Sequence, residues 1–454
     1  MDDRFWDRAK ETMDPALRAQ GILQDVKRQL RYVYEELPFY RQYYDEHGFH
    51  PDMVETLDDF TRKVPVLTKD ALRVEQEQHP PFGRYLGFPP EEGLHVHGSS
   101  GTTGRPTFYL FSADDIAYTR KVMAQALYTA GVRRTDIVQI STDLGMFMGG
   151  WGALWGAEEI GAACFTPGAG NAERHVRLMY EVGSTVLITT PTFGLRLLDE
   201  ARARGFDPQR SPLRLGIFIG EPGAGIPGTK AALESGWGIA ALDCATTSEM
   251  TPWATNVECP ERQGVHVLQD EVYTEVVAKD DPQRLLGDGE SGAVVYTHLR
   301  RRGQPMIRFW SGDESRMTAT PCACGRTYPR LPDGVYGRVD DMLILRGVNV
   351  YPSAVQRALL EIEGLGSEHR IVLRRDGAMD QATVRVEYDP RLADGQGGPP
   401  AHVLEDLHHR THAHLRAVTG VRFDIELLPP QSLERFDVKA RRVVDQRGAR
   451  SAVS

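Results

Sequence analysis

One short stretch of the sequence combines glycines, hydroxyl side chains and an arginine. It reads His97-Gly-Ser-Ser-Gly-Thr-Thr-Gly-Arg-Pro-Thr107 and contains Ser99, Ser100, Gly101, Thr102, Thr103, Gly104 and Arg105. Glycines let the main chain approach an anion closely, and hydroxyl and amide groups donate to phosphate oxygens. The composition predicts a loop that holds a phosphate chain, although such a run is also typical of a solvated turn. Its spacing differs from the Walker pattern.

Extended segments at 94–96 and 108–111 flank this loop and are expected to position it. Farther along, between residues 114 and 300, short apolar runs alternate with helical stretches such as 117–130. This alternation is typical of crossover units on a largely parallel sheet. The predicted buried strands are 137–141, 163–166, 185–189, 213–219 and 238–242.

The remaining segments complete a two-domain organisation. Apolar residues at helical spacing predict amphipathic helices in 5–48, and 272–277 and 293–299 are expected to be antiparallel strands. Beyond Tyr336 the chain has strands and helices of its own. We expect an α/β fold with a large N-terminal domain (1–337) of mixed, largely parallel sheets and flanking helices, followed by a small, mobile α+β C-terminal domain (338–454).

Composition narrows the functional classes. The 454 residues include 53 Lys and Arg against 63 Asp and Glu, a net charge of −10, and a nucleic-acid surface normally shows a basic excess. The first residues lack the apolar core of a signal peptide, and no run approaches the ~18 apolar residues of a membrane helix. We expect a cytoplasmic protein without nucleic-acid or membrane partners. Five cysteines in a chain of this length predict reduced thiols.

Four residues form a possible metal-binding set: Cys259, His266, Cys322 and Cys324. Three sulfurs and one imidazole suit a structural, tetrahedral Zn²⁺ site. The spacings C-x6-H and C-x-C differ from those of common zinc fingers. The alternative is a simple turn at Cys322 and Cys324 with Cys259 buried.

Five segments in order resemble motifs of the adenylate-forming superfamily, which includes acyl-CoA synthetases and luciferases. They are Ser99 to Thr107, Thr246-Thr247-Ser248-Glu249, Ser311-Gly312-Asp313, Gly337 to Pro352 and the region around Lys439. Within the superfamily, the segment 145–153, Glu221-Pro222 and the string Arg346 to Pro352 resemble the phenylacetate-CoA ligase branch. The resemblance covers nearly the whole chain.

The resemblance implies roles for single residues. The loop from Ser99 to Arg105, with Glu221, Thr246, Thr247, Ser248 and Gly347, would bind ATP or AMP and CoA. Glu249 would hold Mg²⁺, Asp313 the ribose hydroxyls, and Arg338 ribose or phosphate oxygens. Lys439 would act at the reacting carboxylate, and Asp340 would be the hinge. Ala245 replaces the aromatic residue usual in the superfamily, so stacking on adenine is expected to be weaker or to come from elsewhere.

The acid would lie against residues that the family places around it: Phe147, Gly150, Trp151, Phe193 and Gly220. Aromatic rings beside glycines suit a flat aryl acid, because glycine leaves room for a ring. The same aromatic side chains could equally be part of the core.

The expected activity is an acid-thiol ligase. A carboxylic acid, expected to be aryl or arylacetic in keeping with the branch, reacts with ATP to give an acyl adenylate and pyrophosphate, and CoA then gives acyl-CoA and AMP. One alternative is transfer to a carrier-protein thiol or an amine. Another is a nucleotide-binding regulator without turnover. A homodimer is a further expectation.

The assignment of Lys439 can be tested with the two half-reactions separated. Lys439→Ala should abolish acid-dependent ATP/pyrophosphate exchange, because a cation would no longer reach the carboxylate and α-phosphate. Transfer from a supplied acyl adenylate to CoA should be spared. Equal survival of both half-reactions would contradict the assignment.

Overall fold

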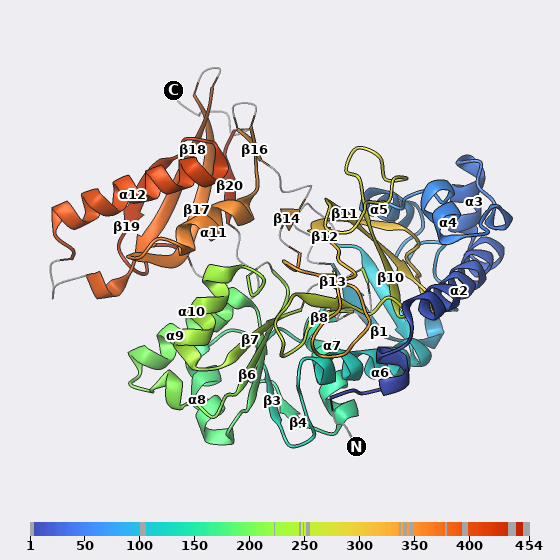
Figure 1. Cartoon of the computed structure of the whole chain (residues 1–454), viewed down its shortest axis with the longest axis horizontal. Helices are drawn as coiled ribbons and strands as arrows, with labels where there is room; N and C mark the ends of the chain where they lie inside the picture. Colours follow the sequence, from blue (N-terminus) through green and yellow to red (C-terminus); the bar gives the residue numbers. More distant parts are fainter. Residues whose placement is uncertain are drawn as a thin grey trace.

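The computed structural model describes most of the chain as two bodies, shown in Figure 1. The small C-terminal body lies beside α9 and α10 of the large one. The described residues are 4–99, 106–146, 148–221, 223–244, 247, 249–250, 255–335, 337–338, 343–345, 348–376, 379–392, 398–434 and 442–447.

A five-stranded parallel sheet forms the centre of the large body, as the alternating pattern predicts. Its order is β4 (Ala163–Phe165), β3 (Ile137–Ile140), β5 (Val186–Thr189), β6 (Leu215–Phe218) and β7 (Ala240–Asp243). Helices α6 (Ala113–Thr129) and α7 (Met148–Ile160) share one hydrophobic core with one face of the sheet. Helices α8 (Ala172–Val182), α9 (Pro191–Ala203) and α10 (Pro227–Trp237) share another core with the opposite face.

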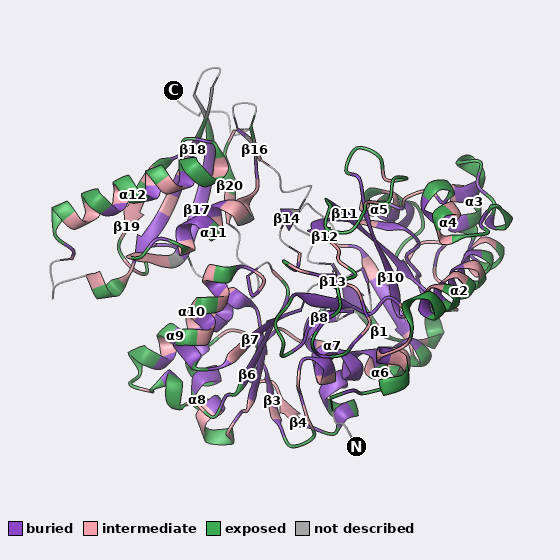
Figure 2. Ribbon diagram, in the orientation of Figure 1, coloured by how far each residue is buried: buried purple, intermediate pink, exposed green. Residues whose placement is uncertain are grey.

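The strands of this sheet are apolar on both faces, which explains their continuous hydrophobic runs. Val186 and Ile188 belong to the core beneath α6 and α7, whereas Leu187 belongs to the core beneath α8 to α10. Figure 2 shows the resulting buried interior of the large body. A sheet covered on both sides leaves its strand ends as the places where polar side chains can gather.

Three antiparallel sheets complete the large body. One has the order β10 (Val272–Val277), β11 (Ser291–His298), β12 (Phe309–Arg316) and β14 (Gly337–Arg338), which confirms the two expected antiparallel strands. Another has the order β13 (Arg330–Leu331), β9 (Val265–Val267) and β8 (Asn256–Glu258). The third pairs β1 (Gly93–Gly98) with β2 (Phe108–Ser112), the two extended segments expected around the loop.

The N-terminal region is helical, as its periodicity predicts. It contains α1 (Arg8–Glu11), α2 (Pro15–Glu36), α3 (Pro38–Glu46), α4 (Leu57–Lys63) and α5 (Lys69–Gln78). Thr68 caps α5 by accepting a hydrogen bond from the amide of Ala71. Short 3-10 turns span Pro51–Met53, Pro90–Glu92, Pro208–Arg210 and Pro390–Leu392.

The first helices dock through buried polar contacts as well as apolar ones. Glu11 is buried; its carboxylate accepts hydrogen bonds from the amides of Trp6 and Asp7 and from Nε of Arg326 at 2.7 Å. Arg18 is also buried, with its guanidinium 4.0 Å from the ring centre of Tyr328.

The C-terminal body has a mixed sheet with the order β19 (Asp424–Leu428), β18 (Met379–Tyr388), β17 (Leu365–Asp376) and β20 (Val443–Asp445). Helices α11 (Pro352–Leu360) and α12 (Ala401–Thr419) pack with it, and β15 (Leu343–Leu345) pairs with β16 (Val348–Val350). The expected α/β fold with a small α+β unit is confirmed. Among the helices of the described ranges, none has both the length and the apolar composition needed to cross a membrane.

Candidate active site

The predicted phosphate loop is closed at its base by its first and last polar residues. The hydroxyl of Ser99 accepts hydrogen bonds from the amide and hydroxyl of Thr107, at 3.2 and 3.0 Å. The amide of Ser99 donates to the carbonyl of Thr107, and the Thr107 hydroxyl contacts that of Tyr109 at 2.8 Å. β1 and β2 therefore hold both ends of the loop in a fixed position.

A buried carboxylate with a cation beside it lies in the predicted magnesium motif. Glu249 is 4% exposed and makes an ion pair with Nζ of Lys69 at 2.7 Å. The hydroxyl of Thr247 donates to the same carboxylate. Burial alone would raise the pKa of Glu249, but Lys69 and Thr247 outweigh it and the pKa is lowered. The carboxylate is therefore held ionised, as a metal ligand must be.

Lys69 is a residue that the sequence did not single out for the site. It lies 180 positions before Glu249 and begins α5, where the Thr68 cap was the visible signal. The cap places the first turn of α5 beside the motif, so the lysine reaches the carboxylate. The position of this basic residue directly after a capping threonine is the sequence signal that could have pointed to it.

The predicted ribose site lies where two strands of the antiparallel sheet meet. Asp313 on β12 is buried, and its amide donates to the hydroxyl of Ser311 at 3.0 Å. Its main chain lies opposite that of Arg338 on β14. The sheet register thus brings together two residues that the resemblance assigns to the same nucleotide.

Gly220 and Glu221 follow the carboxyl end of β6. Gly220 has φ +85°, a left-handed turn that favours glycine. The carboxylate of Glu221 accepts a hydrogen bond from the amide of Thr192 at 2.8 Å. Ligands of open α/β sheets bind at this end of the strands, so both residues lie at the expected edge.

The residues predicted to contact the acid have packing roles of their own. A Cβ atom at Gly150 would lie 2.6 Å from the carbonyl oxygen of Asp143, so the space beside this glycine is filled by the chain. The indole of Trp151 donates to the carbonyl of Leu144 at 2.6 Å and packs against His95. Phe193 is buried against His175. Contact of these residues with the acid stays a prediction.

Asp243 is a second residue that the sequence did not single out. It ends β7 just before the 246–249 motif and is buried. Burial and the neighbouring Glu258 raise the pKa of its carboxyl group to about 7, although Lys230 acts in the opposite direction. Glu258 itself accepts hydrogen bonds from Nζ of Lys230 at 2.7 and 2.8 Å. A carboxyl group that is partly protonated near pH 7 therefore lies at the ligand-binding edge.

The four predicted metal ligands come together in one buried cluster. Their ligand atoms all lie within 4.8 Å of one another. The distance from Cys259 Sγ to Cys322 Sγ is 3.8 Å, and Nε2 of His266 lies 3.4 Å from Sγ of both Cys259 and Cys324. Bond lengths of about 2.3 Å for Zn–S and about 2.0 Å for Zn–N give tetrahedral edges of about 3.8 and 3.5 Å. These three distances are close to the edges of such a tetrahedron.

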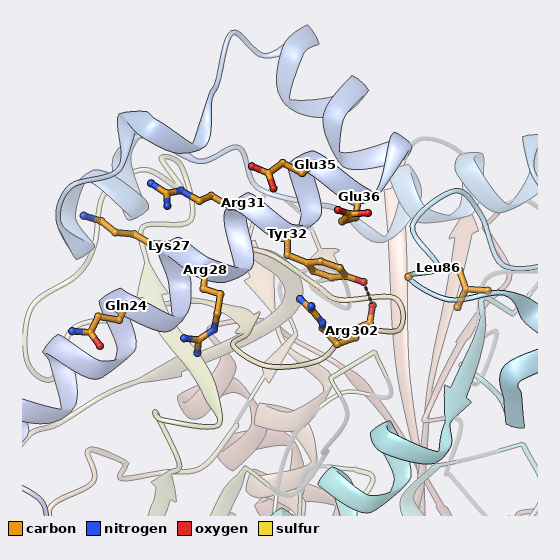
Figure 3. Close-up of a pocket in the computed structure, with 10 residues that line it drawn as sticks. Gln24, Lys27, Arg28, Arg31, Tyr32, Glu35, Glu36, Leu86 and Arg302 are labelled. Atoms are coloured by element: carbon orange, nitrogen blue, oxygen red, sulfur yellow. Dashed lines mark hydrogen bonds between the residues drawn. The ribbon is translucent and has the colours of Figure 1, made fainter.

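A separate surface pocket of about 780 Å³ lies along α2, away from these residues. Figure 3 shows its basic and acidic side chains together with Tyr32 and Arg302. The Tyr32 hydroxyl donates to the carbonyl of Arg302, whose guanidinium lies 3.9 Å from the tyrosine ring centre. None of the pocket's lining residues belongs to the predicted site.

Several predicted site residues lie outside the described ranges. For Arg338 only the main chain is described. The residues outside the ranges are Ser100, Gly101, Thr102, Thr103, Gly104, Arg105, Phe147, Thr246, Ser248, Asp340, Gly347 and Lys439. Of the predicted nucleotide-site and acid-site residues that are described, Ser99 follows β1, and Asp313 and Arg338 lie in β12 and β14. Gly220 and Glu221 follow β6, Thr247 and Glu249 follow β7, Gly150 and Trp151 lie in α7, and Phe193 lies in α9.

Comparison with known proteins decides the family. Residues 347–447 match the model of the AMP-binding enzyme C-terminal domain. The phenylacetate-coenzyme A ligase of Thermus thermophilus is 36% identical over 433 residues, which cover 93% of this chain and 95% of the relative. The chain belongs to the phenylacetate-CoA ligase family. The Escherichia coli ligase of the same name is 33% identical, with 93% of this chain and 94% of the relative covered.

Members of this family are AMP-forming acid-CoA ligases, and the expected activity is confirmed at that level. The chain uses ATP to activate a carboxylic acid as an acyl adenylate and transfers the acyl group to CoA. ATP, a small-molecule acid and CoA are its substrates.

Solved structures show a close likeness as well. The structure of 2-hydroxyisobutyryl-CoA ligase in the postadenylation state is 38% identical and superposes with a TM-score of 0.93, covering 98% of this chain and 93% of that one. The same ligase with CoA in its thioesterification state gives 0.74 at the same coverage and 39% identity. The arrangement of the two bodies here thus resembles the former state.

The raised pKa of Asp243 predicts a pH dependence of stability. A carboxyl group whose pKa is raised on folding stabilises the fold below its unfolded pKa of about 3.9 and loses this contribution as pH rises towards 7. Asp243→Asn should therefore match the wild type near pH 4 and be more stable than it at pH 8. Thermal unfolding of both proteins across this range, with the exposed Asp424→Asn as control, measures the difference. A difference that is independent of pH would contradict the prediction.

Proposed function

We propose that the acid is an arylacetic or related aryl acid. The observation that carries this proposal is the set of four phenylacetate-CoA ligases, 33 to 36% identical, that each align with at least 93% of this chain. The half-buried indole of Trp151 beside His95, in the segment that the family places around the acid, agrees with it. Aromatic rings prefer such edge contacts.

A short 2-hydroxy acid is the second candidate. It is favoured by the 38 to 39% identity to 2-hydroxyisobutyryl-CoA ligase, which is slightly higher than the identity to the phenylacetate ligases. The two acids differ in what the pocket must offer. A phenyl ring needs an apolar slot, whereas a hydroxyl group needs a hydrogen-bonding partner.

The adenylation step joins two anions that repel each other. The proposed residues reduce this repulsion by supplying positive charge and hydrogen-bond donors. The acid carboxylate attacks the α-phosphorus of ATP, a P–O bond forms, and the bond to pyrophosphate breaks. Lys439 stabilises the charge at the reacting carboxylate and α-phosphate. The loop from Ser99 to Thr107 binds the phosphates, and Asp313 and Arg338 bind the ribose. Lys69 adds a positive charge beside Glu249.

Thioester formation needs a different set of residues at the same reaction centre. The CoA thiol attacks the acyl carbon of the adenylate, the C–S bond forms, and AMP leaves. We assign the hinge to Asp340 and the domain boundary to residues 337 and 338, so that residues 338–454 turn and bring the loop with Gly347 to the thiol path.

Glu249 is the proposed Mg²⁺ ligand, with Thr247 and Ser248 next to it. The buried, ionised carboxylate fits this role because hard cations prefer oxygen ligands. When bound, the ion offsets the negative charge of the triphosphate. In this structure the cation beside Glu249 is Lys69. A bound Mg²⁺ ion would take the place of the lysine at this carboxylate or bind next to it.

The cluster of Cys259, His266, Cys322 and Cys324 is proposed to hold a structural Zn²⁺ ion. Burial of all four residues and edge lengths that match a tetrahedron support this assignment. When bound, the ion would cross-link the β8–β9 turn to the segment that leads into β13.

A cytoplasmic location and a homodimer also remain proposals, and light scattering of the purified protein tests the latter.

A substrate screen tests the proposed acid. Pyrophosphate release is measured with phenylacetate, benzoate, 2-hydroxyisobutyrate and acetate, with and without CoA. Phenylacetate should exceed 2-hydroxyisobutyrate by about 100-fold in kcat/KM, because a pocket shaped for a ring gains little from a short acid. Glu249→Gln should abolish release, whereas the exposed Glu159→Gln should not change it. The reverse preference would favour the 2-hydroxy acid, and release of AMP without CoA would contradict CoA as the acceptor.

Metal analysis tests the zinc proposal. Protein purified without chelator should contain about one equivalent of zinc, and Cys322→Ser should contain less than about 0.2. Cys164→Ser is the matched control, because Cys164 lies on β4 outside the cluster. Wild-type protein without zinc would refute the assignment.

A further inference from the structure

Arg442 joins the two bodies at the start of β20. Its side chain is 11% exposed and donates from Nη1 to the carboxylate of Glu368 at 3.0 Å, within the small body. From Nη2 it donates to the hydroxyl of Thr192 at 3.2 Å, in the large body. One guanidinium therefore bonds to both bodies at once.

The arginine is held firmly on the side of the small body. The carbonyl of Arg442 accepts a hydrogen bond from the amide of Ile371 at 2.7 Å, where β20 begins to pair with β17. Glu368 is buried and also accepts a hydrogen bond from Arg370. Main chain and side chain are both fixed, so the guanidinium moves with the small body as a rigid unit.

On the other side, Thr192 belongs to the edge of the nucleotide site. It lies in the first turn of α9, and its amide donates to the carboxylate of Glu221. Glu221 follows β6 at the ligand-binding edge. The contacts thus run from Glu368 through Arg442 and Thr192 to Glu221.

Apolar packing accompanies this polar contact. A Cβ atom at Gly228, in the first turn of α10, would lie 3.0 Å from Cβ of Leu360 at the end of α11. α9 and α10 are neighbours in the large body, and α11 lies above them in Figure 1. Both contacts therefore belong to one orientation of the small body.

Lys439 lies close in sequence to the contact between Arg442 and Thr192. It precedes Arg442 by three residues. Three residues of extended chain span at most about 11 Å. An anchor at Arg442 therefore limits the region that the main chain at residue 439 can occupy relative to Thr192 and Glu221.

We propose that Arg442 is a positioning residue for the adenylation half-reaction, through its hydrogen bond to Thr192. The inference rests on the proposed role of Lys439. The bond holds the small body in the orientation in which the lysine can serve adenylation, and it must break when that body turns for thioester formation. The present arrangement resembles the postadenylation state of 2-hydroxyisobutyryl-CoA ligase more than its thioesterification state, with TM-scores of 0.93 and 0.74.

The test compares the two half-reactions in Thr192→Val, which keeps the shape of the side chain and the amide bonded to Glu221. Acid-dependent ATP/pyrophosphate exchange should fall about 10-fold, the loss expected for a hydrogen bond to a charged group. Transfer from a supplied acyl adenylate to CoA should stay within about twofold of the wild type. Thr192→Ser, which restores the hydroxyl, should recover exchange.

Arg442→Gln should show the same split with a larger loss of exchange. Arg385→Gln is the matched control, because this exposed arginine bonds to Glu426 within the small body. An equal fall of both half-reactions in Thr192→Val, or unchanged exchange, would overturn the proposal. Lys439→Ala, measured alongside, separates the two ideas. Exchange that survives in Lys439→Ala contradicts the role of the lysine, whereas exchange lost there but kept in Thr192→Val contradicts the role of Arg442.

Discussion

Electrostatic repulsion between a carboxylate and a nucleotide triphosphate is the constraint on which the site depends. The groups that must meet are all anions, so the protein has to supply positive charge and donors from a fixed framework. The pair of Glu249 and Lys69 shows how the fold prepares for this. The buried carboxylate of Glu249 stays ionised, and Nζ of Lys69 lies beside it, next to the place where phosphates are expected.

The framework around that pair is a parallel sheet covered on both faces. Most residues of these strands face one of two apolar cores, and the polar residues Glu221 and Asp243 lie after the end of β6 and at the end of β7. The antiparallel sheet adds Asp313, and the β1–β2 pair adds the loop closed by Ser99 and Thr107. These parts of the chain are distant in sequence, and hydrogen bonds within the protein hold several of their polar side chains in place.

Much of this arrangement could be predicted from sequence, because it depends on local signals. Buried strands such as Val186–Thr189 are continuous apolar runs, and Thr68 is a capping residue before a helical pattern. The cysteine cluster was predictable because few side chains bind zinc. Strands of two or three residues, such as β14 and β20, carry no periodicity and were missed. Leu17 lies in α2 but is exposed, whereas the neighbouring Arg18 is buried beside Tyr328.

Contacts between segments that are distant in sequence could not be predicted from the sequence. Lys69 meets Glu249, and Arg442 meets Thr192, only because whole elements dock in a particular way. No local pattern encodes such pairs, and the resemblance to the family covered the motifs but not the residues that support them. Asp243 was missed for a related reason, since its unusual protonation comes from burial next to Glu258.

The contact between Glu11 and Arg326 has a wider consequence. Arg326 follows Cys324 by two residues, and its guanidinium also donates to the carbonyl of Arg4. The opening segment of the polypeptide therefore contacts the residues next to the cysteine cluster through this buried ion pair, and Thr327 adds hydrogen bonds to the main chain at Glu11 and Met13. We expect segments joined in this way to be protected together against hydrogen exchange. If the cluster holds the proposed zinc ion, loss of the ion would affect the amino-terminal segment, where Glu11 lies more than 300 positions before Arg326 in sequence.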